Sequence, residues 1–338
     1  MTTPFIRPVR RDDFNEILTL AQAAGGGMTN LPADEEALRT RIDFAVESFA
    51  ANASEPGPEV YMLVLEVDGR VLGTAAVFSA IGLDSGFVNY KVVWTFHASK
   101  QLDKRIERRL LVPTHDFTGA SEVGSLFLSH DARGGGFGKL LARTRYMFIA
   151  QKPEIIGDHV CAELRGWRSE DGGQPFWDAL GRNFFEMEFE EADVHNAANG
   201  NQFIADLMPR YPVYVCLLPE AARDCIGKPH QNAAPAYDML LREGFEFNDY
   251  VDIFDAGPLV DARVKNIKTI KDSRLSTVLD IRDDDGPGED ALIAAGAVET
   301  FRAVRASIRT EEGGVVLTSA AARGLNIDVG ADVRWAAW

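Results

Sequence analysis

A glycine-rich turn is the part of this sequence whose residue types and spacing are best suited to ligand chemistry. A short apolar run at 123–128 precedes it, and from Leu140 onward apolar side chains recur at helical spacing. Glycines let backbone N–H groups approach an anion, and the N-terminus of a helix adds a partial positive charge. We therefore expect a phosphate group to bind between a buried strand and a helix over 138–151. The residues expected around it are Arg133, Gly134, Gly136 and Gly138.

The spacing of this turn narrows the choice of phosphate ligand. It contains neither the G-x-G-x-x-G of dinucleotide-binding folds nor the G-x-x-x-x-G-K-[ST] of a P-loop. Instead Arg133, Gly136 and Gly138 spell R-x-x-G-x-G. This pattern resembles the acyl-CoA pyrophosphate loop of the GNAT superfamily of N-acyltransferases. An ordinary strand–helix connection with several glycines is the alternative, but the strand before and the amphipathic helix after favour the resemblance.

N-acyl transfer from a thioester needs an uncharged amine, stabilisation of the oxyanion and a proton for the leaving thiolate. Backbone N–H groups around Leu126 and Leu128, on the expected central strand, can hold the oxyanion and the pantetheine amides. The superfamily's helix motif, A-x-x-x-Φ-x-x-x-G-F, is matched at 236–245, but Leu240 stands where tyrosine is common. His230, just before that helix, is the best-placed substitute. A loop histidine taken alone is more often a surface or capping residue.

Apolar periodicity predicts the elements that position these residues. The expected strands lie at 5–9, 60–67, 71–81, 123–128, 160–164 and 251–254. Helices are expected to begin near residues 10, 34, 102, 138 and 236, with Asp34 as an N-cap. Aromatic residues between 85 and 118 suggest a further extended segment beside the sheet. This order resembles a GNAT core, which implies that the strands at 123–128 and 160–164 diverge and that acyl-CoA enters the gap.

An insertion and a C-terminal region extend this core. About 65 residues, 166–231, separate the diverging strand from the helix that should follow it, and they are too aromatic for a mobile loop. We expect a folded helical cover over the active site or a subunit interface. After Asp255, strand-like runs predict a small β-barrel, with a glycine turn between strands in 325–334. These runs lie at 264–270, 274–281, 301–308 and 315–317.

The predicted fold class is therefore α+β. A GNAT-like mixed central sheet flanked by helices occupies 1–255 and contains the helical insertion. A small β-barrel domain occupies 256–338, and since no nucleophile, metal set or phosphate loop occurs there, we expect it to stabilise or pair subunits.

Composition limits the classes of partner. The chain has 338 residues, 46% apolar and 25% charged, as expected of a soluble globular protein of two domains. Its formal net charge of −16 argues against nucleic acid or an anionic membrane as partner. Cys161, Cys216 and Cys225 have no metal-ligand spacing and leave an odd thiol, which fits reduced cysteines. With no signal-like N-terminus and no apolar run of about 18 residues, we expect a cytoplasmic protein without a metal or a membrane anchor.

Longer stretches resemble one family in that superfamily, the arginine N-succinyltransferases. The resemblance covers most of 5–260 and is specific within the insertion; its stretches are 29–32, 119–122, 125–128, 162–166, 175–177, 203–209 and 250–258. It implies transfer of the succinyl group of succinyl-CoA to the α-amine of L-arginine, the first step of an arginine degradation route. It also implies His230 as proton donor, Leu126 as a contact of succinyl-CoA, and no permanently bound cofactor. Gly124 departs from the family's usual cysteine, which leaves the preference between arginine and ornithine open.

The sequence does not single out the residues that bind the acceptor substrate. A guanidinium pairs best with carboxylates in bidentate geometry. Glu163 and Glu122, on or before the central strands, are candidates, and Arg165 could meet either the succinyl carboxylate or the substrate α-carboxylate. Further carboxylates in the insertion are more often a solvated face; these are Glu186, Glu188, Glu190 and Glu191.

Two other functions are compatible with these residues. One is a GNAT enzyme for another amine, such as ornithine. The other is a non-catalytic acyl-CoA-binding subunit that pairs with a related chain, and a homo-oligomer is a further possibility for assembly. The intact R-x-x-G-x-G turn together with His230 speaks against a silent subunit.

Overall fold

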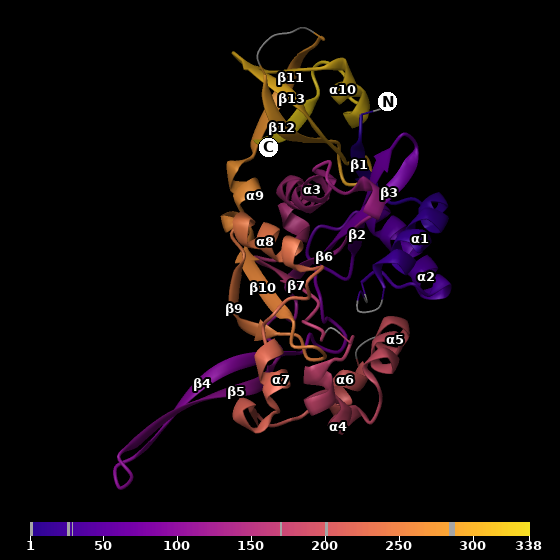
Figure 1. Ribbon diagram of the computed structural model, residues 1–338. Helices are drawn as coiled ribbons and strands as arrows, with labels where there is room; N and C mark the ends of the chain where they lie inside the picture. Colours follow the sequence, from indigo (N-terminus) through magenta and orange to yellow (C-terminus); the bar gives the residue numbers. More distant parts are fainter. Residues whose placement is uncertain (1–2, 26–27, 29, 170, 200–201, 284–287) are drawn as a thin grey trace.

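The computed structural model describes residues 3–25, 28, 30–169, 171–199, 202–283 and 288–338, and its strands form one continuous sheet (Figure 1). The strand order is β12-β15-β11-β14-β13-β1-β2-β3-β6-β7-β10-β9-β4-β5-β8, and β12 also pairs with β13. The strands of the main body are β1 (Phe5–Pro8), β2 (Val60–Val67), β3 (Arg70–Phe78), β4 (Asn89–Ser99), β5 (Lys104–Thr114), β6 (Ser121–Leu128), β7 (His159–Glu163), β8 (Val213–Tyr214), β9 (Glu246–Val251) and β10 (Pro258–Arg263). The C-terminal strands are β11 (Arg274–Ile281), β12 (Glu289–Ala295), β13 (Arg302–Glu311), β14 (Gly314–Leu317) and β15 (Asp332–Ala337).

Helices cover both faces of the central strands (Figure 1). In chain order the α-helices are α1 (Phe14–Ala24), α2 (Glu35–Ala50), α3 (Phe137–Gln151), α4 (Arg182–Phe185), α5 (Phe189–Asn199), α6 (Gln202–Leu207), α7 (Glu220–Cys225), α8 (Ala234–Glu243), α9 (Lys268–Asp272) and α10 (Ser319–Leu325). Of these, α4 to α7 belong to the insertion and α10 packs in the barrel. Strand β2 shows why two layers form. Its Tyr61 and Leu63 pack in the core with α3, whereas Met62 and Val64 pack in the core with α1 and α2. A strand that is apolar at every position from Val60 to Leu65 needs a cover on each face.

The insertion is helical, as predicted, and has its own aromatic core. Trp177 is fully buried and stacks on Phe185 and Phe254, with ring centroids 5.2 and 5.5 Å apart. The same cluster includes Tyr90 at the start of β4 and Val251 at the end of β9. The insertion is therefore fastened to the far end of the sheet by apolar packing.

The C-terminal strands close into a five-stranded barrel, as predicted. Each of β12, β13, β14, β11 and β15 pairs with the next, and β15 pairs with β12 to complete the ring. Strand β1 joins this barrel to the main sheet, because Phe5 pairs with Glu66 on β2 and with Val304 on β13. One short strand thus carries the strand-to-strand link between the two parts, and Arg143 on α3 adds a hydrogen bond to the Ala337 carbonyl of β15 at 2.9 Å.

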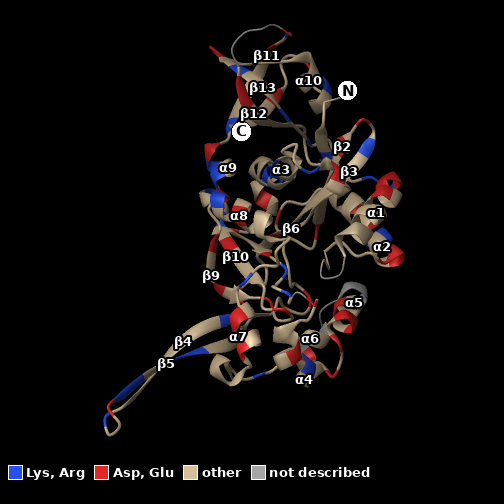
Figure 2. Cartoon of the chain, viewed as in Figure 1, with Lys and Arg blue, Asp and Glu red and all other residues tan. Residues whose placement is uncertain are grey.

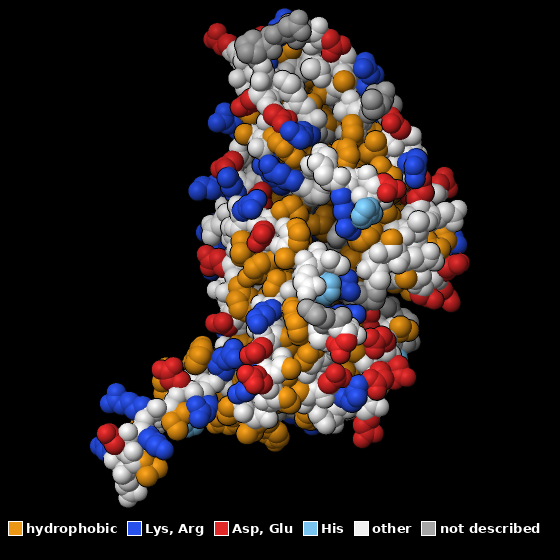
Figure 3. All heavy atoms as spheres, in the orientation of Figure 1, with side chains coloured by type: hydrophobic (Ala, Val, Ile, Leu, Met, Phe, Trp, Pro, Cys, Tyr) orange, Lys and Arg blue, Asp and Glu red, His pale blue; other side chains and the backbone are white. Residues whose placement is uncertain are grey.

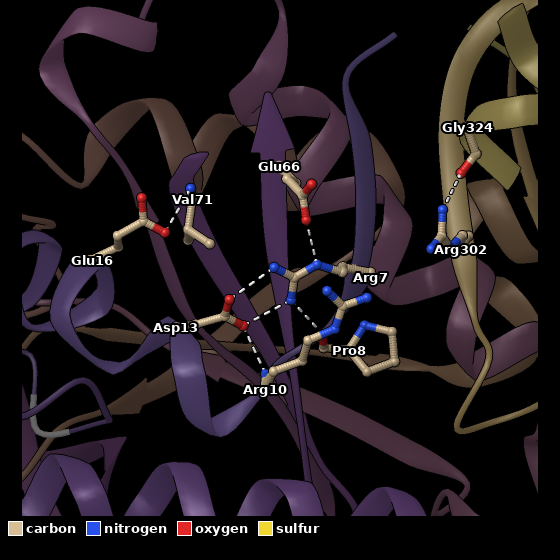
Figure 4. Close-up of polar contacts among 9 residues, drawn as sticks. All are labelled: Arg7, Pro8, Arg10, Asp13, Glu16, Glu66, Val71, Arg302 and Gly324. Atoms are coloured by element: carbon tan, nitrogen blue, oxygen red, sulfur yellow. Dashed lines mark hydrogen bonds and ion pairs between the residues drawn. The ribbon is translucent and has the colours of Figure 1, made fainter. Parts of the chain in front are cut away.

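A buried ion-pair network holds β1 in place (Figure 4). Arg7 on β1 is 5% exposed and donates to both carboxylate oxygens of Asp13, at 2.7 and 2.8 Å. Its Nε also donates to Glu66 on β2 at 2.6 Å. Asp13 in turn accepts the backbone N–H of Arg10 at 2.7 Å, which fixes the turn into α1.

Two of the secondary-structure predictions for the main body are wrong. The helix expected over 102–111 is β5, which pairs with β4 at every position from Asn89 and Thr114 to Ser99 and Lys104. Cross-strand pairing therefore overrides the helix-like spacing of its apolar residues. The strand expected at 251–254 ends at Val251, because the Asp252 carboxylate accepts the N–H groups of Phe254 and Asp255 and forms a turn.

The C-terminal region also differs from expectation in detail. The strand expected at 264–270 is a 3-10 turn (Val264–Asn266) followed by α9. Its apolar residues recur every third position, which suits a helical turn rather than an alternating strand. Strand β12 has no counterpart among the expected strands, and the glycine turn in 325–334 follows α10 rather than a strand. Thr318 caps α10 by accepting the N–H of Ala321 at 3.2 Å.

The position of the domain boundary stays a proposal. Strand β10 pairs with β7 and β9 and so belongs by its hydrogen bonds to the main sheet. We therefore propose a boundary between Arg263 and Arg274 rather than at residue 255.

Within the described residues, no helix is long and apolar enough to cross a membrane. The same part of the chain contains no group of three or more His, Cys, Asp or Glu side chains placed to hold a metal ion.

Candidate active site

The central strands β6 and β7 separate after two residue pairs. They pair in parallel only through Ser121 with Val160 and Glu122 with Cys161. Leu126 and Leu128 therefore lie on the half of β6 that has left its neighbour, and both side chains are half-buried. On its other edge β6 stays paired with β3. Beyond Glu122 no strand of the described chain pairs with β6 on this edge, so its backbone groups there can bind an extended ligand.

A bulge at Ser125 follows the point of separation. Ser125 has a φ of +48°, and the register between β3 and β6 shifts here. Thr74 donates to the Ser125 carbonyl and Ser125 donates to the Asn30 carbonyl, both at 2.8 Å. These bonds hold a conformation that a non-glycine residue rarely adopts.

The glycine turn leads directly from β6 into α3. Gly134 and Gly136 have φ values of +91° and +81°, and Gly136 is the N-cap of α3. Among the residues that the structure describes, no side chain caps this helix, and its first turn contains no acidic residue. Gly138 lies within that turn and has open space where a side chain would project. Uncapped N–H groups at a helix N-terminus suit an anion.

The turn adjoins the barrel in a locally basic region. A Cβ at Gly136 would lie 3.3 Å from Nη1 of Arg305, and Nζ of Lys139 lies 4.3 Å from the ring of Trp338. Arg133 itself is exposed. Figure 3 shows Lys and Arg side chains gathered around α9 and the adjoining end of the barrel, on a protein that is acidic overall.

His230 lies on the segment that occupies the place β6 has vacated. Its N–H donates to the Arg165 carbonyl at 2.7 Å, and Trp167 N–H donates to the Lys228 carbonyl at 3.0 Å. The N–H of Leu164 points the other way and donates to the carbonyl of Pro258, the first residue of β10. Because successive backbone groups of a strand point to opposite sides, His230 is on the β6 side of the β7 extension.

The backbone and ring of His230 are held from several directions. Its carbonyl accepts the N–H groups of Ala233 and Ala234 at the start of α8, at 2.8 and 3.0 Å. Its Nδ1 accepts the Asn232 N–H at 3.1 Å, while Nε2 makes no hydrogen bond to the described chain. Burial and the guanidinium groups of Arg165 and Arg168 lower the pKa of His230. The ring is half-buried and is held with one nitrogen available.

Glu163 faces the same region from the end of β7. Its Oε1 accepts Nδ2 of Asn89 at 2.7 Å, and Asn89 is fully buried with its Oδ1 unpaired within the described chain. Burial, followed by the carboxylates of Asp252, Glu122 and Asp255, raises the pKa of Glu163 well above its ordinary value. Glu163 and Asn89 together therefore offer acceptor atoms in a negative field.

Two further predicted candidates adjoin this site. Burial raises the pKa of Glu122 to about 7, although its Oε1 accepts Nδ2 of Asn30 at 3.0 Å. Arg165 is half-buried, and its pKa is lowered by burial and by Arg168. Being two residues beyond Glu163 on an extended segment, Arg165 projects to the same face as Glu163. The acidic residues 186, 188, 190 and 191 of the insertion lie on its surface rather than at this site.

Sequence reasoning missed two residues that shape the site. Asn89 lies in the region whose elements are hardest to place from sequence. Asp255 is expected only to mark a domain boundary, yet its carboxylate accepts the N–H groups of Gly166 and Gly257 at 2.7 and 2.8 Å. A Cβ at Gly166 would lie 2.5 Å from the Asp255 carbonyl, so glycine is needed for this approach. Asp255 thereby fixes the β7 extension against which His230 binds.

Comparison with known proteins gives consistent matches along the chain. Residues 4–269 match the family model described as arginine N-succinyltransferase beta subunit, and 274–337 match that of its C-terminal domain. Arginine N-succinyltransferase subunit beta of Pseudomonas aeruginosa is 42% identical over 333 residues, covering 97% of this chain and 96% of that protein. Arginine N-succinyltransferase of an Enterobacter species is 39% identical over the same shares.

A solved structure matches the whole fold. The arginine/ornithine succinyltransferase subunit AI from P. aeruginosa superposes with a TM-score of 0.89 at 35% identity, covering 100% of this chain and 99% of that one. Because two family models span both parts of the sequence and these relatives match nearly its full length, the chain belongs to the arginine N-succinyltransferase family.

Proposed function

We propose that this acyltransferase moves the succinyl group of succinyl-CoA to the α-amine of L-arginine, giving N2-succinylarginine and CoA. The observation that carries the proposal is the gap between β6 and β7, which is bounded by an uncapped glycine turn and by His230. Family membership supports the reaction class. Succinyl-CoA is a co-substrate here, and no permanently bound cofactor is required. The three free cysteines suit a reducing compartment, and we propose that the protein acts in the cytoplasm.

The donor would lie along β6. The turn with Arg133, Gly134, Gly136 and Gly138 would bind the pyrophosphate, with the basic edge of the barrel nearby. The pantetheine arm would hydrogen-bond to the free backbone edge of β6. This brings the thioester beside Leu126 and Leu128, where N–H groups can stabilise the oxyanion.

The proton balance of the reaction defines the role of His230. The attacking nitrogen loses one proton and the departing sulfur gains one. A neutral His230 can take the first proton and deliver it to the thiolate as the C–S bond breaks. The proton is taken up and released at Nε2 of His230. The neutral ring must therefore carry its proton on Nδ1, and in that tautomer Nδ1 no longer accepts the hydrogen bond from the Asn232 N–H.

The acceptor would bind between Glu163 and Arg165. A guanidinium placed at Glu163 and the unpaired oxygen of Asn89 gains charge-assisted bonds and relieves repulsion among neighbouring carboxylates. Arg165 would bind a carboxylate, either of arginine or of the succinyl group. The second candidate acceptor is ornithine, because the P. aeruginosa subunit of matching fold is described as an arginine/ornithine succinyltransferase.

One assay tests the proposed reaction directly. Purified protein is incubated with succinyl-CoA or acetyl-CoA against arginine, ornithine and lysine, and the products are identified by mass spectrometry. Succinylarginine as the main product supports the proposal. Faster turnover of ornithine would change the acceptor, and no transfer by an otherwise folded protein would favour a subunit that needs a related partner chain.

Gly138→Asp is expected to weaken binding of succinyl-CoA by roughly 10–100-fold. A carboxylate about 6 Å from a phosphate charge costs on the order of 3 kcal/mol at an effective dielectric of about 20, less after screening. The open space at Gly138 lets the variant fold. Isothermal titration should show near-normal affinity for the matched variant Gly138→Asn. Equal affinity of the Asp and Asn variants would remove the turn from the site.

Glu163→Gln is expected to lower kcat/KM for arginine by roughly 10–100-fold, since a hydrogen bond to a charged group is worth about 1.5–3 kcal/mol. The slower reaction of norvaline, which has no guanidinium, should change little. Glu186→Gln, on the exposed face of the insertion, serves as the matched control. A Glu163→Gln variant that loses activity equally with arginine and norvaline would show that Glu163 does not recognise the guanidinium.

A further inference from the structure

A two-stranded arm leaves the body of the molecule at β4 and β5 (Figure 1). Its base is fixed, because Tyr90, Val92 and Leu111 are buried in the core of the insertion. Strand β4 pairs with β9 only through Tyr90 and Lys91, and β5 pairs with β8 only through Leu110 and Leu111. From 93 to 109 the two strands have no other strand beside them in the described chain. We call residues 93–110 the arm.

The arm exposes large apolar side chains. Phe96 is 73% exposed, Leu102 67% and Trp94 52%. A lone two-stranded ribbon is at best marginally stable in water, and clustered exposed apolar groups on a soluble protein mark an interaction site. The arm therefore has the shape and the composition of one half of an interface.

The charge of the arm is opposite to that of the molecule (Figure 2). It carries five basic residues and two acidic ones, a formal charge of +3 in a chain of net charge −16. The basic residues are Lys100, Lys104, Arg105, Arg108 and Arg109. A basic, aromatic arm fits a surface that is acidic and partly apolar.

The insertion of the same protein offers such a surface. Glu190 and Glu191 are exposed at the start of α5. Phe184 and Val194 on the neighbouring turns are 41% and 68% exposed. Figure 3 shows acidic and hydrophobic side chains mixed on this part of the molecule. Each copy of the chain thus carries both complementary surfaces.

From these features we infer that the arm of one copy seats on the acidic insertion of a second copy, in a reciprocal homodimer. Stable interfaces use about 20–30 residues from each partner. Each copy would contribute its own arm together with the insertion surface that receives the other arm, which is enough to reach that size. The two copies would be related by a two-fold axis, so each arm binds the insertion of the other copy. Both arms are then occupied, and association stops at the dimer.

The apolar contact is tested by sedimentation of the full chain over a range of concentrations. The wild type is expected to be a dimer. Trp94→Ser combined with Phe96→Ser should raise the dimer dissociation constant on the order of 30-fold or more, as expected for central aromatic contacts. The matched control is Val329→Ser, an equally exposed apolar change on the barrel at 57% exposure. A wild type that stays monomeric at tens of micromolar would overturn the inference.

Charge reversal tests where the arm seats. Arg105→Glu with Arg108→Glu, and separately Glu190→Arg with Glu191→Arg, should each dissociate the homodimer. An equimolar mixture of the two double variants should associate again, because the reversed arm of one variant then meets the reversed insertion of the other. Circular dichroism confirms that each variant is folded. If the two dissociated variants fail to associate on mixing, the insertion is not the surface that binds the arm. Association is measured without substrate, so its failure is distinct from failure of the proposed reaction.

Discussion

Replacing His230 by alanine is expected to lower kcat with arginine by on the order of 10²–10⁴, the usual contribution of a positioned acid–base group. Binding of succinyl-CoA should barely change, because its phosphates and pantetheine are proposed to bind to the glycine turn and β6. The deficit should shrink with an acyl donor whose leaving thiol has a lower pKa, since that thiolate needs less protonation. Steady-state kinetics with a series of succinyl thioesters, together with titration calorimetry, measures both effects.

The pH dependence of the same enzyme gives an independent check. Because burial, Arg165 and Arg168 lower the pKa of His230 from 6.5, the ring stays neutral to lower pH than usual. The relay starts from the neutral ring, so kcat/KM should fall on the acid side with a midpoint below 6.5. Arg168→Gln should move this midpoint to higher pH, and the control His130→Ala should leave it in place. Near-normal kcat in His230→Ala would exclude it as the proton carrier and direct attention to Tyr237 or His130.

Asp13→Ala is expected to lower the free energy of unfolding by about 3–5 kcal/mol, the usual cost of leaving one partner of a buried ion pair alone. Arg7 would keep its charge at 5% exposure with only Glu66 opposite it. Equilibrium unfolding in urea measures the loss. The chain offers a matched control in Asp43→Ala, which breaks a 2.7 Å pair with Arg11 whose side chains are 45% and 58% exposed.

The control should cost at most about 1 kcal/mol, as exposed ion pairs do. Both variants remove an Asp–Arg pair near the same turn, but Asp13→Ala also removes the acceptor of the Arg10 N–H, so the comparison reports the buried network as a whole. If the two variants unfold at the same urea concentration, the buried network of Arg7 does not stabilise the attachment of β1.

Local patterns predict the parts of the site that are close in sequence. The strand, glycine turn and helix from 123 to 151 follow from apolar period and glycine content, and the cap of α2 follows from Asp34, which accepts the N–H of Ala37 at 2.9 Å. His230 stands out in the sequence because it immediately precedes a recognisable helix. The divergence of β6 from β7 follows from the family resemblance and is confirmed by their two residue pairs.

Contacts between distant residues cannot be predicted in this way. Asn89 reaches Glu163 across 74 positions, and Asp255 reaches Gly166 across 89. Nothing in the types or spacing of these residues distinguishes them from surface polar residues. The same limit explains why a helix is predicted where β5 lies: the strand conformation of β5 depends on its pairing with β4 and not on its own sequence alone. The roles proposed for Glu163 and Arg165 stay predictions.

The pairing of β1 with both the barrel and the main sheet sets the order of events while the chain is being synthesised. Phe5 and Ile6 are synthesised about 300 residues before their partners on β13, Val304 and Ala303. At about 5–20 residues per second, that edge of β1 waits on the order of 15–60 s for its neighbour. An open strand edge invites pairing with other chains. Strand β1 is short and ends in Pro8, which has no N–H to donate, and both features limit that hazard during the wait.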